Sequence, residues 1–106
     1  MHKTKKLVAG DYVLATKYSD GDPCDHFGVG FFIGMAGDRY LVEDNEGRLI
    51  RGSGFRRCER ISQYIGNILV AAIPLIGDQQ GRSLWYWRYH PGQLNAMIVD
   101  VGDKDE

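Results

Sequence analysis

The sequence predicts a single α+β domain in which a small five-stranded antiparallel barrel is followed by one or two packed helices. Two observations predict it. Residues 10–61 consist of short β-type runs separated by turn-forming residues, and residues 62–90 change to helical spacing of apolar residues. A chain of 106 residues suits one domain, here residues 1–106, and no repeat or linker divides it.

The expected strands lie at about 11–17, 27–35, 39–44, 48–52 and 55–60. Turn formers separate the later runs, at Gly37-Asp38, Asn45-Glu46-Gly47 and Gly52-Ser53-Gly54. The second run contains three glycines, which predict bends at a barrel corner. Residues 1–9 form a basic leader.

A helix is expected from Ser62, a good N-cap, to Pro74, which should end it or start the next turn. Ser83 can cap a second short helix up to Pro91-Gly92, although the aromatic residues at 84–90 also suit a strand. Residues 96–101 are expected to form a last strand. The expected core comprises Val13, Val29, Phe32, Leu41, Val42, Ile61, Ile65 and Leu69.

Composition points to an ordinary globular protein. Apolar residues make up 43% of the chain and charged residues 25%, and the net charge is −1. Such a balance gives no overall attraction to nucleic acid or to an anionic membrane. The two cysteines, Cys24 and Cys58, are too far apart to suggest a metal motif, and no secretory signal precedes the first strand. We therefore expect a cytoplasmic protein with free thiols and no cofactor.

A family resemblance covers a little over half the chain. Three stretches together resemble a Tudor or chromo-type barrel of the Src-homology-3-like class. They are Gly10-Asp11-Tyr12-Val13-Leu14-Ala15, Phe27-Gly28-Val29-Gly30, and the run from Tyr40 to Asp44 with Gly47. In that class, loop aromatics form a cage for a methylated lysine or arginine, or a groove for a peptide or nucleic acid. The resemblance implies such a site at Tyr18, Phe27, Tyr40 and Asp44. The long acidic first loop and the helical C-terminal segment depart from the family pattern.

The first loop, Asp20-Gly21-Asp22-Pro23-Cys24-Asp25 before His26 and Phe27, is also similar to a loop in small phage and prophage proteins. Its carboxylates, thiol and imidazole are metal-ligand types. The loop lacks the later glycine and distal glutamate of a calcium loop, so we expect no bound metal. A solvated turn with side chains bonded to the backbone is the simplest interpretation, and a recognition loop is the alternative.

An arginine-rich stretch follows in the second half of the predicted barrel. Its arginines could bind the phosphates of a nucleic acid, and the phenylalanine among them could stack on a base. These residues are Arg48, Arg51, Phe55, Arg56, Arg57 and Arg60. An ordinary charged exterior, or the docking face of an acidic protein, would give the same pattern.

The aromatic run at 84–90 can either close the core or form a partner surface or homodimer. No spacing suggests a catalytic site: Gly52-Ser53-Gly54 is not a nucleophile elbow, and Cys58 is interpreted as a strand thiol. The predicted function is a non-enzymatic interaction module, of the kind found as phage accessory proteins, that binds or occludes a partner protein. Nucleic-acid binding is the alternative. The predicted partner-binding residues are Tyr18, Asp20, Asp22, Asp25, Phe27, Tyr40, Asp44, Trp85 and Tyr89.

Overall fold

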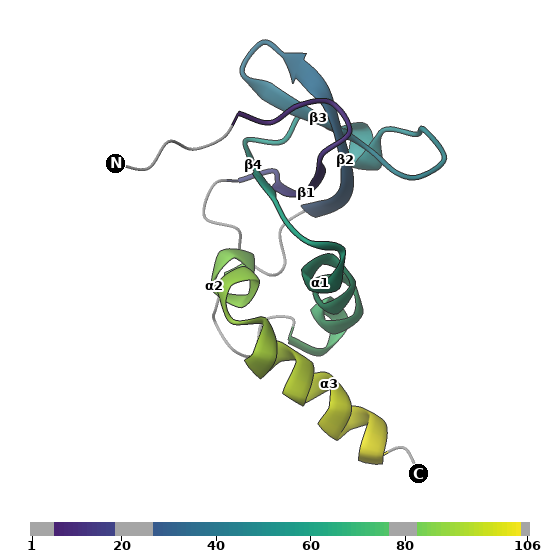
Figure 1. Ribbon diagram of the computed structural model, residues 1–106, viewed down its shortest axis with the longest axis vertical. Coiled ribbons are helices and arrows are strands. Elements are labelled where there is room, and N and C mark those ends of the chain that lie inside the picture. Colours follow the sequence, from purple (N-terminus) through teal and green to yellow (C-terminus); the bar gives the residue numbers. More distant parts are fainter. Residues whose placement is uncertain (1–5, 19–26, 77–82, 105–106) are drawn as a thin grey trace.

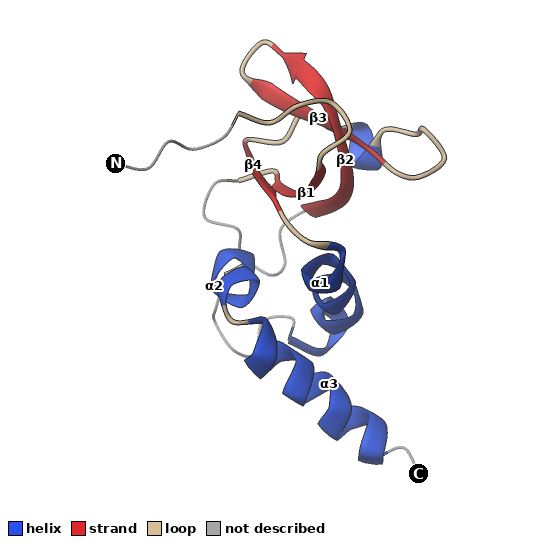
Figure 2. Cartoon of the chain, in the orientation of Figure 1, coloured by secondary structure: helices blue, strands red, loops and turns tan. Residues whose placement is uncertain are grey.

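A computed structural model describes residues 6–18, 27–76 and 83–104. The described chain is α+β, with a four-stranded antiparallel sheet followed by three helices (Figure 1; Figure 2). The strands are β1 (Tyr12–Thr16), β2 (Phe27–Ala36), β3 (Arg39–Glu43) and β4 (Arg57–Arg60). The helices are α1 (Gln63–Ile76), α2 (Leu84–Tyr89) and α3 (Pro91–Lys104), and a 3-10 helix, η1 (Ile50–Gly52), precedes β4.

The strand order is β3-β2-β1-β4, with every pair antiparallel. The register places Tyr12 opposite Phe31 and Val13 opposite Arg60. A bulge interrupts the β2–β3 ladder between Phe32 and Gly34, where Gly34 has a φ of 151°. This confirms the bend expected from the glycines, because only glycine adopts such a backbone readily.

The expected fourth strand at 48–52 is wrong, and the sheet of the described residues is open. Asp44 causes the difference, since its carboxylate accepts the N–H groups of Glu46 and Arg48 and curls the chain into a turn. Only Leu49 then makes an isolated bridge to β3, and Arg51 enters the left-handed region at φ 49° inside η1. A strand cannot continue through that backbone.

The expected last strand at 96–101 is also wrong, because α3 covers it. Pro91 opens this helix rather than stopping the chain, as a proline can at the first helical position, where no N–H bond is needed. The helical interpretation of 84–90 is confirmed by α2, whose N-terminus is capped by the Ser83 side chain through the Tyr86 N–H at 3.2 Å. Ser62 likewise accepts the Ile65 N–H at α1, which ends two residues after Pro74.

Two hydrophobic clusters form the core. One joins Leu14 of β1 to the buried residues of the three helices, and the other lies inside the curled sheet around Val13, Phe32, Val42 and Phe55. Of the eight predicted core residues, five are buried, and the remaining three, Val29, Leu41 and Ile65, are half-buried. The helices gather at one end of the sheet, so the molecule has a sheet half (6–60) and a helical half (61–104) (Figure 1). Within the described ranges, no helix is both long and apolar enough to cross a membrane.

Candidate binding site at the sheet seam

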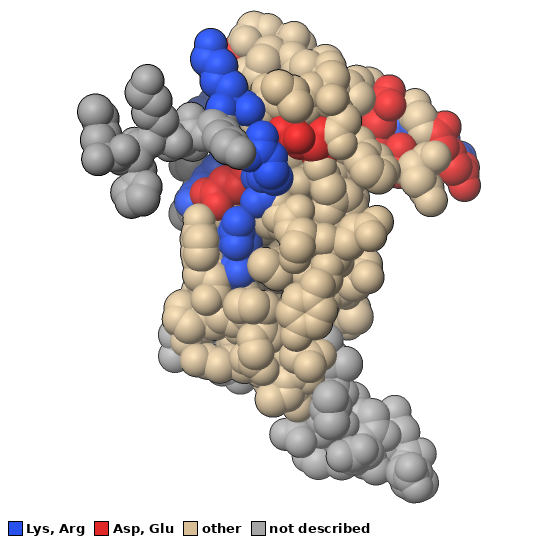
Figure 3. Space-filling model, in the orientation of Figure 1, with Lys and Arg blue, Asp and Glu red and all other residues tan. Residues whose placement is uncertain are grey.

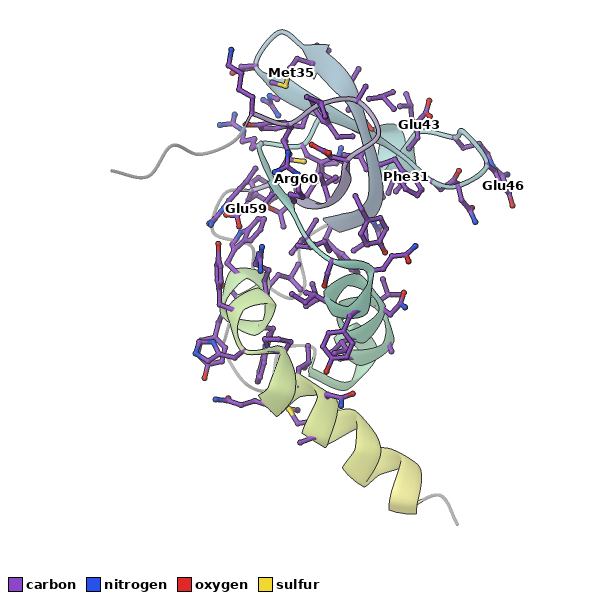
Figure 4. The ribbon with its side chains drawn as sticks, in the orientation of Figure 1. Phe31, Met35, Glu43, Glu46, Glu59 and Arg60 are labelled. Carbon is purple, nitrogen blue, oxygen red and sulfur yellow. The ribbon has the colours of Figure 1, made fainter. Side chains whose placement is uncertain are left out.

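A hollow of about 840 Å³ opens at the seam between the two edges of the sheet. Its apolar floor comes from the N-terminal segment, β2 and β3, through Leu7, Phe32, Met35 and Tyr40. Its polar wall comes from β4, α2 and the N-terminal segment, through Lys6, Cys58, Glu59, Arg60 and Tyr89. Figure 4 shows Glu59 and Arg60 next to one another along β4, with Met35 at the far tip of the β2–β3 hairpin. We call this site the seam hollow.

The β3 edge of the seam is closed by the segment after η1. Tyr40 exchanges two backbone hydrogen bonds with Phe55, at 2.9 and 3.0 Å. Val42, two residues after Tyr40 in β3, is bonded by a side chain instead. The buried Ser53 hydroxyl accepts the Val42 N–H and donates to the Val42 carbonyl, both at 2.8 Å. A side chain therefore replaces a strand at this position, and the β3 edge offers no unpaired backbone groups there.

The outer edge of β4 has no strand partner among the described residues. Ile61 continues the pairing of β4 with β1, since its N–H donates to the Tyr12 carbonyl at 3.0 Å. Backbone groups of an antiparallel strand face alternate sides, so those of Cys58 and Arg60 face away from β1. The Arg60 carbonyl confirms this direction, because it accepts a hydrogen bond from Arg88 of α2 at 2.8 Å. Within the described ranges, the N–H and carbonyl of Cys58 have no partner.

Glu59 connects this edge to α2. One of its carboxylate oxygens accepts the Arg57 guanidinium at 2.5 and 3.1 Å, and the other accepts the Tyr89 hydroxyl at 2.7 Å. Arg88 lies 3.4 Å from the same carboxylate, and Arg57 also stacks 3.8 Å from the centre of the Trp85 ring. Burial raises the pKa of Glu59, but the hydrogen bonds from Tyr89 and Arg57 and the charges of Arg57 and Arg88 outweigh it, so the pKa falls below its ordinary value.

Two more groups in or beside the hollow, Asp11 and Cys58, have shifted pKa values. Arg60 bonds Asp11 at 2.7 Å, and this hydrogen bond, with one from the Val8 N–H, lowers the pKa of Asp11. Burial raises the pKa of the Cys58 thiol to about 12, with help from the charges of Glu59 and Asp11. The thiol is therefore neutral at physiological pH and does not have the character of a reactive nucleophile.

The residues implied by the family resemblance are not brought together in the described chain. Phe27 packs on the cluster shared with the helices, beside the Arg51 guanidinium, whereas Tyr40 packs on the cluster inside the sheet. Tyr18 is 59% exposed, and Asp44 serves as the turn-forming carboxylate described above. Only Tyr40 of this set lines the seam hollow.

The arginine-rich stretch is dispersed as well. Phe55 is fully buried and cannot stack on a base. Arg48 pairs with Asp44 and Glu46, and Arg51 donates to the Phe27 carbonyl. The remaining members are the exposed Arg56 and the ion-paired Arg57 and Arg60.

Other predicted site residues have mixed outcomes. Trp85 is buried at 5% exposure, while Tyr89 is 57% exposed and lines the seam hollow. Asp20, Asp22 and Asp25 lie outside the described residues, as do Cys24 and His26. Among the side chains that the structure does describe, no group of three could hold a metal ion.

Sequence reasoning missed the most important parts of the site, namely Leu7, Met35 and Glu59. Glu59 is the only acidic residue between Arg48 and Arg60. A single carboxylate among five arginines was the one feature of the sequence that could have indicated it. Comparison with known proteins adds no assignment, because no family model, curated protein or solved structure matches the chain.

Proposed function

We propose that this protein is a non-enzymatic interaction module that binds a segment of a partner protein in the seam hollow. The observation that carries the proposal is the combination of an apolar floor with a polar wall of few, well-oriented groups. Binding sites have this composition, and the volume of about 840 Å³ lies within their usual range. The neutral Cys58 thiol favours binding over nucleophilic chemistry at this site.

We further infer that the sheet half is a variant of the Src-homology-3-like barrel. Two features support this assignment: β1 pairs with both β2 and β4, and a 3-10 turn replaces the fourth expected strand directly before β4. On this proposal, the seam hollow occupies the position at which a five-stranded barrel would close.

Site-specific photo-crosslinking in the cells that make the protein tests the function. A benzophenone amino acid is placed at Met35 or Tyr89, which are 48% and 57% exposed at the hollow, and at Leu49, which is 48% exposed and does not line it. We expect one partner protein to be crosslinked from Met35 and Tyr89 and not from Leu49. Crosslinks to RNA or DNA would favour the nucleic-acid alternative, and equal yields from all three positions would contradict a specific site.

A further inference from the structure

The two edges of the sheet differ in a way that specifies how a ligand can bind. Ser53 and Phe55 occupy the backbone groups of the β3 edge, whereas Cys58 presents an N–H and a carbonyl toward the hollow side of β4. Unpaired edge groups next to a cavity are the arrangement used in strand addition, where main-chain bonds give affinity and side-chain pockets give specificity.

The charge around the hollow selects the chemistry of the ligand. Among the described residues, three cationic side chains in or beside the hollow, Lys6, Arg60 and Arg88, accompany two carboxylates, Asp11 and Glu59. Figure 3 shows a column of basic side chains along one side of the sheet half, with acidic side chains next to it. Within the described part of the chain, the side-chain hydrogen bonds of Arg60, to Asp11 and to the Lys6 carbonyl, both use the same terminal nitrogen, and the other guanidinium donors can bond a ligand.

Resting on the proposed function, we propose that the partner contributes an extended acidic segment that pairs as a strand with the outer edge of β4. Its backbone bonds the N–H and carbonyl of Cys58. Its side chains on the face of Cys58 and Arg60 enter the hollow, with apolar residues toward Phe32 and Tyr40 and acidic residues toward Lys6 and Arg60. The sequence of residues 1–5 fits this chemistry poorly, since Lys3 and Lys5 have the opposite charge to the acidic ligand inferred here.

Selection from a displayed library of random seven-residue peptides tests the proposal on the full chain. We expect the enriched peptides to carry acidic and apolar residues two positions apart, on one face of the added strand. Binding of an enriched peptide, measured by fluorescence anisotropy, should weaken about ten-fold in Cys58→Pro, which removes the outward N–H at an edge position where proline is tolerated. The matched control, Cys58→Ala, keeps the N–H and should bind within about two-fold of the wild type.

Amide hydrogen exchange provides a second measurement if Cys58→Pro does not fold. On peptide binding, exchange of the Cys58 N–H should slow, while that of Asn45 on the distant hairpin should not change. Peptides that bind Cys58→Pro as tightly as the wild type, or that leave the Cys58 exchange unaltered, would overturn strand pairing. A basic or uncharged consensus would overturn the acidic preference.

The two proposals fail separately. If a partner protein crosslinks at Met35 and Tyr89 but no peptide is enriched, the strand-addition inference is wrong and the proposed function stands. If neither a crosslink nor an enriched peptide is found, both are wrong.

Discussion

At the scale of single residues, Ser53 shows how one side chain can replace a strand. Its backbone lies at φ 57° and ψ −153°, a region that favours glycine. The hydroxyl explains why serine is nevertheless suited to this position, because glycine could not satisfy the N–H and carbonyl of Val42. Position 53 therefore combines an unfavourable backbone conformation with two buried side-chain hydrogen bonds.

Replacing this serine should therefore separate the two effects. Ser53→Ala loses both hydrogen bonds and keeps the backbone strain, so we expect the free energy of unfolding to fall by about 1–3 kcal/mol. Ser53→Gly loses the same bonds but relieves the strain, so it should be less destabilised than Ser53→Ala. Urea denaturation measures both. Equal stability of Ser53→Ala and the wild type would show that the hydroxyl contributes nothing.

Glu59 gives a prediction about acid stability. Because its folded pKa is lowered, ionised Glu59 stabilises the fold above the unfolded pKa of about 4.3, and this stabilisation is lost as the pH falls through the folded value. We expect Glu59→Gln to reduce the dependence of unfolding free energy on pH in this acidic range. Asp38→Asn, whose side chain is 95% exposed in the wild type, is the control and should keep the wild-type slope. A slope unchanged by Glu59→Gln would contradict the assignment.

At the scale of elements, the position of α1 is fixed by a close approach to β1. A Cβ atom added at Gly66 would lie 2.6 Å from the Tyr12 ring, so only glycine allows the helix to pack this tightly. The helix contains no charged residue over its whole length, and contact with the sheet and α3 rather than surface ion pairs holds it in place.

Two glycine substitutions distinguish packing from helix propensity. Gly66→Ala should cost about 1–3 kcal/mol through overpacking against Tyr12, although alanine favours helices. Gly92→Ala in the first turn of α3 meets nothing within 4 Å and should stabilise by about 0.4–1 kcal/mol. Thermal unfolding of the two variants should move in opposite directions. A stabilised Gly66→Ala would show that α1 is not packed against Tyr12.

At the scale of the whole molecule, much of the fold could be predicted from local patterns and the site could not. Alternation and capping predicted β1 to β3, α1 and α2, because those signals lie within each segment. The turn at 48–52 depends on the Asp44 carboxylate and the contacts of Ser53, and α3 depends on whether Pro91 stops or starts a helix. The seam hollow joins residues from opposite ends of the chain, which only the topology brings together.

The shared cluster predicts that the sheet and helical halves unfold together. Leu69 is fully buried in the same cluster as Leu14 of β1, so Leu69→Ala should lower the unfolding free energy by about 2–5 kcal/mol. Far-ultraviolet circular dichroism and tryptophan fluorescence should report one coincident transition in both the wild type and the variant. Val70→Ala, at a 54% exposed position, is the control and should cost far less. Separate transitions would show that the halves are independent.

The stacking of Arg57 on Trp85 also gives the molecule an intrinsic optical probe. The guanidinium lies 3.8 Å from the centre of the indole ring and also bonds Glu59, which forms part of the hollow. A ligand that bonds the Arg57 guanidinium or the Glu59 carboxylate changes the electric field across the Trp85 indole. The wavelength of the Trp85 emission changes as a result. In Trp87→Phe, where Trp85 is the only remaining tryptophan, occupancy of the hollow could be followed by titration without any attached dye.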